Sequence, residues 1–79
     1  MNIQIKLFAS LGKYLPESTT RKQAPLSVPE NITIKGVLEQ LGIPRKMAKL
    51  IMVNGMHRKS DDVLQEGDLL SIFPPVAGG

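Results

Sequence analysis

The chain has 79 residues, a formal net charge of +3 and no cysteine. A chain of this length forms one small domain, and without cysteine it can make neither disulfides nor thiolate metal sites. The basic residues are scattered and include no run of five or six like charges. We therefore interpret the net charge as that of a solvated basic surface. The alternative is that it steers the chain toward an acidic partner or RNA.

The N-terminal segment lacks the pattern of a secretory signal, because Lys6 interrupts its apolar residues. No stretch contains the ~20 consecutive apolar residues that span a bilayer. Hydrophobic residues make up 42% of the chain, which favours a folded domain over disorder. We therefore expect a cytoplasmic protein with no membrane segment.

The first segment of the chain, residues 2–8, alternates with a period of two and predicts a half-buried strand. Its two faces are Ile3, Ile5 and Leu7 on one side and Gln4, Lys6 and Phe8 on the other. Residues 9–25 are rich in turn-forming residues and predict a connection with one short helical turn near 11–15. A short second strand is expected at 26–28, ended by Pro29.

Residues 34–41 give the clearest helix signal, because their apolar side chains recur at i, i+3, i+4 and i+7. Thr33 is the expected N-cap. Gly42 stands where a left-handed residue closes the last turn, and Ile43 can then fold back in a Schellman motif. Gly36 costs up to ~1 kcal/mol inside a helix relative to Ala, which close packing on a sheet would explain.

Three more strands are expected at 50–53, 56–58 and 69–73. Asn54 and Gly55 join the first two of them in a type I′ turn, in which both central residues need positive φ. A polar loop at 59–62 and a turn at 66–68 lead into the last strand. Asp68 is expected to accept N–H groups of that turn.

One helix can cover only one face of such a sheet. We therefore predict an α+β fold with a mixed sheet of four to five strands and one main helix on one face, formed by residues 1–73. If the apolar side of residues 2–8 faces the helix, then Phe8 and Phe73, the only two Phe residues, face outward. That placement would suit a docking surface; the alternative is that one or both fold over an edge of the sheet.

Residues 74–79 predict a flexible, extended C-terminal tail. Its members are Pro74, Pro75, Val76, Ala77, Gly78 and Gly79. Two consecutive prolines cannot extend the hydrogen-bonded ladder of the last strand, and six extended residues reach at most roughly 20 Å. Such a segment could enter a slot in another protein, with Val76 as an anchor; a merely frayed terminus is the alternative.

A terminal carboxylate at Gly79 is a poor electrophile until it is activated, for example as an acyl-adenylate made from ATP. Sulfur attack on that adenylate would give a thiocarboxylate, and amine attack would give an amide. The chain has no nucleophile–base pair and no phosphate-binding loop of its own. We therefore expect it to be the substrate of a partner enzyme and not catalytic alone.

The closing stretch GDLLSIFPPVAGG at 67–79 resembles the C-terminal signature of the sulfur-carrier proteins of molybdopterin and thiamine biosynthesis. The segments IMVNG at 51–55 and LFASL at 7–11 resemble the hairpin and first strand of the same family. The Pro-Pro-Val-x-Gly-Gly pattern and the length look more like the small subunit of molybdopterin synthase than the thiamine carrier. One departure is that Leu11 is followed by Gly12, where many members carry an Arg soon after the Phe-Ala pair.

The resemblance implies a ubiquitin-like β-grasp domain. It also implies that an E1-like enzyme uses ATP to adenylate Gly79, that a thiocarboxylate follows, and that the tail enters the large subunit of molybdopterin synthase. Sulfur would there pass to a pterin precursor of the molybdenum or tungsten cofactor. Phe8 and Phe73 match the family's docking face, Pro74 to Gly78 its inserted tail, and no cofactor is expected to be bound.

Other functions stay open at this point. The same terminus could carry sulfur for thiamine or another thio-product, or be joined to lysines as a protein modifier. A basic RNA-binding module is a third hypothesis, but no aromatic stacking platform stands out, so no nucleic acid is expected. His57 is the only histidine, and adjacent Asp61 and Asp62 suit a solvated loop, so no metal site is expected.

Overall fold

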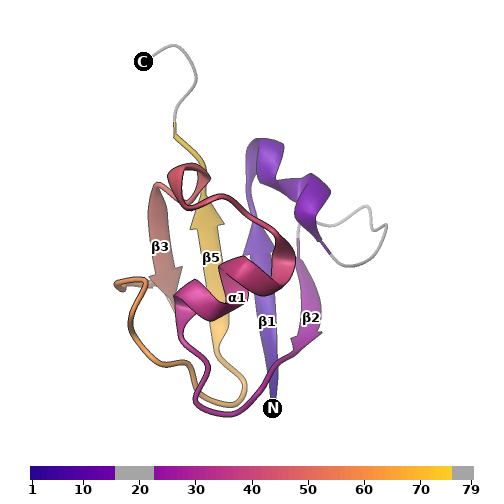
Figure 1. The fold of residues 1–79 in the computed structure, drawn as a ribbon, viewed down its shortest axis with the longest axis vertical. Coiled ribbons are helices and arrows are strands. Elements are labelled where there is room, and N and C mark those ends of the chain that lie inside the picture. The colour runs from indigo at the N-terminus through magenta and orange to yellow at the C-terminus, as the bar shows by residue number, and fades with distance from the viewer. Residues whose placement is uncertain (16–22, 76–79) are drawn as a thin grey trace.

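A computed structural model describes residues 1–15 and 23–75 of the chain. Within these two ranges, five strands form one sheet in the order β2-β1-β5-β3-β4, and the helix α1 lies across one face of it (Figure 1). The strands are β1 (Asn2–Leu7), β2 (Gln23–Ser27), β3 (Leu50–Val53), β4 (Met56–His57) and β5 (Leu69–Phe73). The helices are α1 (Ile34–Leu41) and two 3₁₀ helices, η1 (Ala9–Tyr14) and η2 (Arg45–Met47).

The sheet is mixed. β1 and β5 are parallel neighbours at its centre, whereas β1–β2, β3–β5 and β3–β4 pair antiparallel. Because β1 and β5 run the same way, both end at the same edge of the sheet. The predicted α+β fold, with one main helix on one face of a mixed sheet, is confirmed.

The core lies between α1 and the covered face of the sheet. The strand residues on that face alternate with half-buried ones, as the period of two in β1 predicts. α1 turns the apolar stripe predicted from its i, i+3, i+4 pattern toward them. The buried side chains of these three elements are Ile3, Ile5, Leu7, Ile34, Val37, Leu38, Leu70 and Ile72.

Both ends of α1 are closed as the sequence predicts. The Thr33 hydroxyl accepts the Gly36 N–H at 3.0 Å, which satisfies one of the free donors of the first turn. Gly42 takes the left-handed conformation with φ 76°, and the Ile43 N–H then donates to the Leu38 carbonyl at 2.9 Å. This is the Schellman bond.

Gly36 is needed for a different contact from the one suggested by the sequence. A Cβ placed there would lie 2.7 Å from Cγ1 of Ile32, which is closer than carbon atoms tolerate. The glycine therefore makes room for the Ile32 side chain, in the segment that enters the helix, and the close approach is not to the sheet.

The second strand begins earlier than predicted, since β2 covers Gln23–Ser27 and includes Pro25. Met1 and Val28 exchange two backbone hydrogen bonds, at 2.6 and 2.8 Å. Because such pairs alternate along an antiparallel ladder, Pro25 opposite Gln4 falls at a non-hydrogen-bonded pair. Its missing N–H would have faced solvent at the sheet edge, so proline is tolerated there.

The remaining strands agree with the prediction within a residue or two. Asn54 and Gly55 have φ of 52° and 84°, as the type I′ turn requires. β4 is only two residues long, although the Arg58 N–H still donates to the Ile51 carbonyl at 3.1 Å. None of the helices within 1–15 and 23–75 is long and apolar enough to cross a membrane.

We predict that Thr33→Ala lowers the free energy of unfolding by about 1 kcal/mol, because the Gly36 N–H loses its side-chain acceptor. Urea unfolding followed by circular dichroism measures the change. Thr33→Ser is the matched control, since it keeps the hydroxyl and is expected to retain most of the stability. Equal stability of all three chains would contradict the capping role.

Candidate functional site

The two Phe residues form one aromatic pair. β1 and β5 pair in parallel up to Leu7 opposite Ile72, so the next residue of each strand, Phe8 and Phe73, continues the same row. Their rings stack with centroids 4.0 Å apart and planes inclined by 11°. Both side chains are half-buried and lie on the face away from α1, because the alternating partners Leu7 and Ile72 face the core.

Backbone hydrogen bonds hold both members of this pair. The Phe8 N–H donates to the Ile72 carbonyl at 3.2 Å, and the Phe73 carbonyl accepts the Lys49 N–H at 2.9 Å. Ala9 then turns the chain into η1 with φ of 51°. The pair is thus fixed at the ends of the two central strands.

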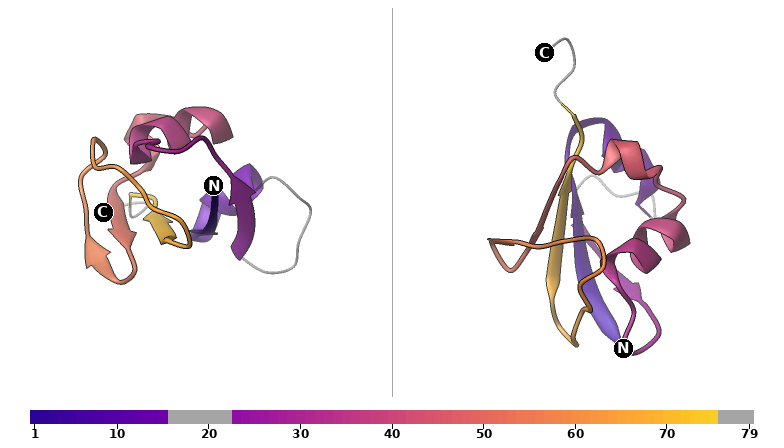
Figure 2. Two further views of the ribbon diagram at one scale, coloured as in Figure 1. Left: turned by 90° about the horizontal axis from the view of Figure 1, so that it is seen from below. Right: turned by 60° about the vertical axis from the view of Figure 1, so that its left-hand side comes forward.

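The sheet face that carries the pair is not covered by a helix among the described residues (Figure 2). We call it the open face. Register places its half-buried side chains in rows across β3, β5 and β1. These rows are Leu50–Phe73–Phe8, Met52–Ser71–Lys6, and Leu69–Gln4.

Lys6 gives the aromatic pair a charged border. Its Nζ lies 5.3 Å from the centroid of the Phe8 ring, within the range of a cation–π contact worth ~0.5–1 kcal/mol at an exposed site. The open face therefore combines an apolar centre with a polar margin, the pattern of a protein-binding surface.

The C-terminal segment leaves the sheet directly beside the aromatic pair. Pro74 is half-buried and Pro75 is exposed, and neither has a backbone N–H to continue the ladder. The tail positions Val76, Ala77 and Gly78 and the carboxyl of Gly79 lie outside the described residues. Their predicted roles in insertion and activation stay predictions.

The other polar candidates lie away from this pair. His57 is exposed on the edge strand β4, and no group of three or more His, Cys, Asp or Glu within 1–15 and 23–75 is placed to hold a metal. Asp68 accepts the Gln65 N–H at 2.8 Å and the Asn54 side-chain amide at 3.0 Å, which confirms its role in the turn.

The loop after β4 contains Asp62, whose carboxylate is held by two hydrogen bonds. The pKa of Asp62 lies below its ordinary value of 3.8, first because its carboxylate accepts the Lys59 backbone N–H and second because it accepts the Arg58 side chain. Both hydrogen bonds are 3.0 Å long. This pairing fixes the loop that passes the start of α1, where the Ile34 N–H donates to the Asp62 carbonyl.

Sequence reasoning did not assign Leu50, Met52 or Lys6 to the site. In the run LIMV every residue is apolar, so alternation could not show which side chains face outward. The sequence did show that Lys6 and Phe8 share one side of the predicted strand, but the aromatic pair that Lys6 borders depends on the pairing of β1 with β5.

Comparison with known proteins agrees with this architecture. A family model described as Mut7-C ubiquitin matches residues 1–78. A search of curated protein sequences found no match. Among solved structures, the crystal structure of SAMP1, the small archaeal modifier protein 1 of Haloferax volcanii, superposes with a TM-score of 0.73 at 22% identity, covering 100% of both chains.

Two further solved structures carry molybdopterin-related descriptions. A Pyrococcus furiosus protein provisionally described as molybdopterin converting factor, subunit 1, has a TM-score of 0.69 at 21% identity and covers 95% of this chain and 98% of its own. A complex of subunits 1 and 2 of the Helicobacter pylori factor contains a chain with a TM-score of 0.60 at 18% identity, with 100% coverage of both. The predicted resemblance to ubiquitin-like β-grasp proteins is thereby confirmed.

We predict that Phe8 and Phe73 stabilise the fold jointly. In a double-mutant cycle of Phe8→Ala, Phe73→Ala and the double variant, the coupling energy is expected to be about 0.5–1.5 kcal/mol, because each ring loses its stacking partner in either single variant. Urea unfolding of the four chains measures it. Strictly additive losses would contradict the contact between the rings.

Proposed function

The chain belongs to the Mut7-C ubiquitin family, and we propose that it is a sulfur carrier whose reactive group is the C-terminal carboxylate of Gly79. The observation that carries this proposal is the position of the aromatic pair. Phe73 is the last residue of β5, so the Pro-Pro-Val-Ala-Gly-Gly segment begins at the edge of an apolar, helix-free face. A partner that binds this face is therefore also next to the start of the C-terminal segment.

The proposed chemistry uses a partner enzyme for activation. An E1-like adenylating enzyme joins the Gly79 carboxylate to the α-phosphate of ATP and releases pyrophosphate. A sulfur nucleophile then attacks the carbonyl of this acyl-adenylate, and AMP leaves. When this nucleophile is a persulfide, the product is an acyl disulfide. A thiol then forms a new disulfide with the donor sulfur, and the chain leaves with a C-terminal thiocarboxylate. The chain itself supplies no catalytic group to these steps.

The proposed acceptor is the large subunit of molybdopterin synthase, where the thiocarboxylate would give its sulfur to a pterin precursor and return to a carboxylate by hydrolysis. Two observations support this choice. The Helicobacter pylori complex joins subunit 1 to subunit 2, and its matching chain has the same fold. The open face presents an apolar row, Leu50–Phe73–Phe8, suited to a stable protein contact.

A second function is favoured by the similarity to SAMP1, which is described as a modifier. In that case the acyl-adenylate is attacked by a lysine amine of a target protein, directly or through an enzyme thioester, and an amide bond forms. Both functions use the same activation of Gly79 and the same docking face. They differ in the nucleophile that takes the acyl group.

We predict that deletion of Gly79 abolishes adenylation while the domain stays folded, because the described fold ends before this residue. The assay measures pyrophosphate release by the E1-like enzyme of the same organism. Ala77→Ser is the matched control, since it alters the tail but keeps both glycines, and it is expected to support release. Undiminished release from the chain lacking Gly79 would reject the proposal.

The products formed from the activated chain distinguish a sulfur carrier from a protein modifier. A carrier purified from its own cells is heavier than the unmodified chain by the difference between a sulfur and an oxygen atom, as intact mass spectrometry shows. C-terminal peptides of this chain joined through Gly79 to lysines of other proteins, found without any thiocarboxylate, would assign the modifier function instead.

We also predict that Phe8→Ala weakens binding to the molybdopterin synthase large subunit of the same organism by tenfold or more, as expected for a buried aromatic anchor worth ~2 kcal/mol or more. Isothermal titration calorimetry measures the affinity. Tyr14→Ala is the control, since Tyr14 is another half-buried aromatic residue that packs against the core, away from the open face. Equal affinity of the unaltered and Phe8→Ala chains would exclude the open face as the docking site.

A further inference from the structure

Four cationic side chains of the described residues gather at one end of the sheet. Five elements meet at the end of the sheet where the C-terminal segment leaves: the end of β1 with η1, η2 with the start of β3, and the end of β5 (Figure 1). This end, which we call the basic end, carries four exposed cationic side chains and no Asp or Glu in residues 8–15, 43–50 and 73–75. They are Lys13, Arg45, Lys46 and Lys49.

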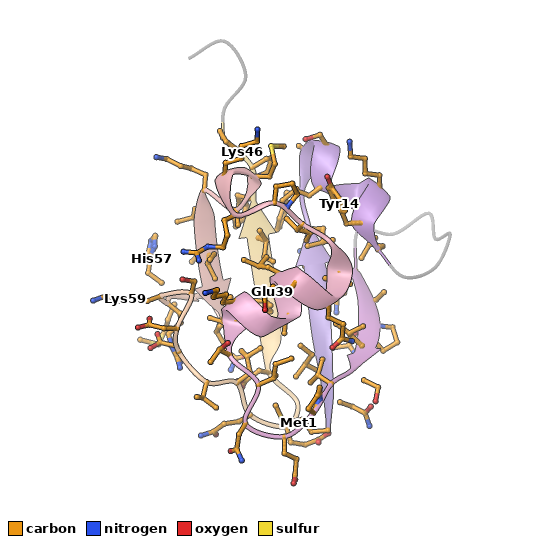
Figure 3. The ribbon with its side chains drawn as sticks, viewed as in Figure 1. Met1, Tyr14, Glu39, Lys46, His57 and Lys59 are labelled. Atoms are coloured by element: carbon orange, nitrogen blue, oxygen red, sulfur yellow. The ribbon has the colours of Figure 1, made fainter. Side chains whose placement is uncertain are left out.

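Lys46 and Lys49 lie closest to the departing chain. The Lys49 backbone N–H is bonded to the Phe73 carbonyl, and Lys46 lies on η2 beside the point where the C-terminal segment leaves (Figure 3). Leu50, the next residue after Lys49, pairs with Phe73 in the apolar row. The basic end is therefore continuous with the open face.

Acidic side chains of the described residues lie in other parts of the fold. Glu66 accepts the Asn2 N–H at 3.0 Å and the Asp68 carbonyl accepts the Gln4 N–H at 2.9 Å, so both lie where β1 begins, at the opposite end of the sheet. Asp62 is paired with Arg58 in the loop after β4.

Within the described residues, none of the four cations of the basic end is within ion-pair distance of a carboxylate, and the one ion pair there joins Arg58 to Asp62. Arg45 donates to the Ser60 hydroxyl at 3.2 Å, and the Lys13 Nζ lies 5.4 Å from the Tyr14 ring centroid. Neither contact neutralises charge. Among the described residues the basic end therefore has a net positive charge and projects a positive potential.

We propose that the basic end docks on an acidic protein surface that borders the entrance of the slot for the C-terminal segment on the adenylating enzyme. This inference rests on the proposed function and adds the chemistry of the partner surface. The four cations lie at the end of the sheet where the C-terminal segment leaves it. An acidic rim would therefore attract the chain in the orientation that directs Gly79 toward the slot. Complementary charge of this kind raises the association rate, by ~10-fold to 1000-fold at low salt.

The geometry favours a protein rim over the reactants as the target of these cations. The six residues from Pro74 to Gly79 reach up to roughly 20 Å, whereas exposed charges are screened over ~8 Å at physiological ionic strength. The four cations thus act on the surface at the entrance and leave the chemistry at Gly79 to the enzyme. RNA is the less favoured partner, because single-stranded binding needs separate aromatic rings for successive bases, and Phe8 and Phe73 stack on each other.

The test compares two charge reversals with the same net charge. Lys46→Glu combined with Lys49→Glu inverts the basic end, and the Lys49 hydrogen bond to Phe73 survives because it is made by the backbone. Lys35→Glu combined with Lys59→Glu is the matched control, since both of these lysines are exposed on other parts of the surface. Circular dichroism and thermal unfolding establish that both variants fold.

The measured quantity is the association rate constant with the immobilised E1-like enzyme of the same organism, over a series of sodium chloride concentrations. At low salt the basic-end variant is expected to associate about tenfold more slowly than the unaltered chain or slower still. The difference is expected to shrink as salt rises, because screening shortens the range of the charges. The control variant is expected to stay within about twofold of the unaltered chain at every salt concentration.

Three results would overturn the inference. Equal slowing by both reversals would show an effect of net charge alone, and a salt-independent rate would show no electrostatic contact. The third result concerns a 20-nucleotide oligouridine RNA. If the unaltered chain binds this RNA, and only the basic-end reversal abolishes the binding while association with the enzyme is unchanged, the basic end is assigned to RNA. Pyrophosphate release is measured in parallel: its absence with the unaltered chain rejects the proposed function together with the inference, whereas normal release with any of the three results rejects the inference alone.

Discussion

The parallel pairing of β1 with β5 is the constraint on which the rest of this structure depends. It joins the first and the last strand of the domain at the centre of the sheet, so every other element is an excursion between these two strands. It also makes both strands end at one edge. Phe8 therefore lies next to Phe73, and the C-terminal segment leaves the sheet beside the end of β1.

The two faces of the sheet follow from this pairing and from the single α-helix. Strict alternation in β1 and β5 sends Ile5 and Leu70 into a dry core and Lys6 and Ser71 to the other side. A chain of 79 residues supplies one helix to cover the core face and nothing within the described residues to cover the other. The apolar row on the open face is thus a consequence of the small size of the chain as well as of its composition. A partner that covers this row removes its apolar surface from water.

The sequence predicted those parts of the fold that depend on local chemistry. The bounds of α1, its Thr33 cap and its Gly42 terminus could be read because each depends on residues within one turn. The Asn54–Gly55 turn could be read for the same reason. The predicted start of β2 was wrong because the tolerance of Pro25 depends on which strand lies beside it and in which register, and no local pattern reports that.

The candidate site shows the same division. That Phe8 and Phe73 face outward followed from alternation within single strands, whereas their stacking and the neighbouring Leu50 follow from pairing between strands. The basic end was missed for a related reason. Arg45, Lys46 and Lys49 form a loose group in the sequence, but Lys13 is about 30 residues away from them. Lys13 joins this group only because η1, η2 and the end of β5 meet at one edge of the sheet.

Two adjoining surfaces of the fold, the open face and the basic end, would then act together in presenting the C-terminal segment to a partner. Ordering a segment in a slot costs about 1–2 kcal/mol of backbone entropy per residue, and glycine loses the most. Binding at the open face can offset that cost, since hot-spot aromatics contribute ~2 kcal/mol or more each. Pro74 and Pro75 lower it, because their φ angles are already restricted before binding. Gly78 and Gly79, which make the end of the chain slender enough to react, are thus the residues that lose the most backbone entropy on binding. Pro74 and Pro75, which lose less, come between these glycines and the open face in the sequence.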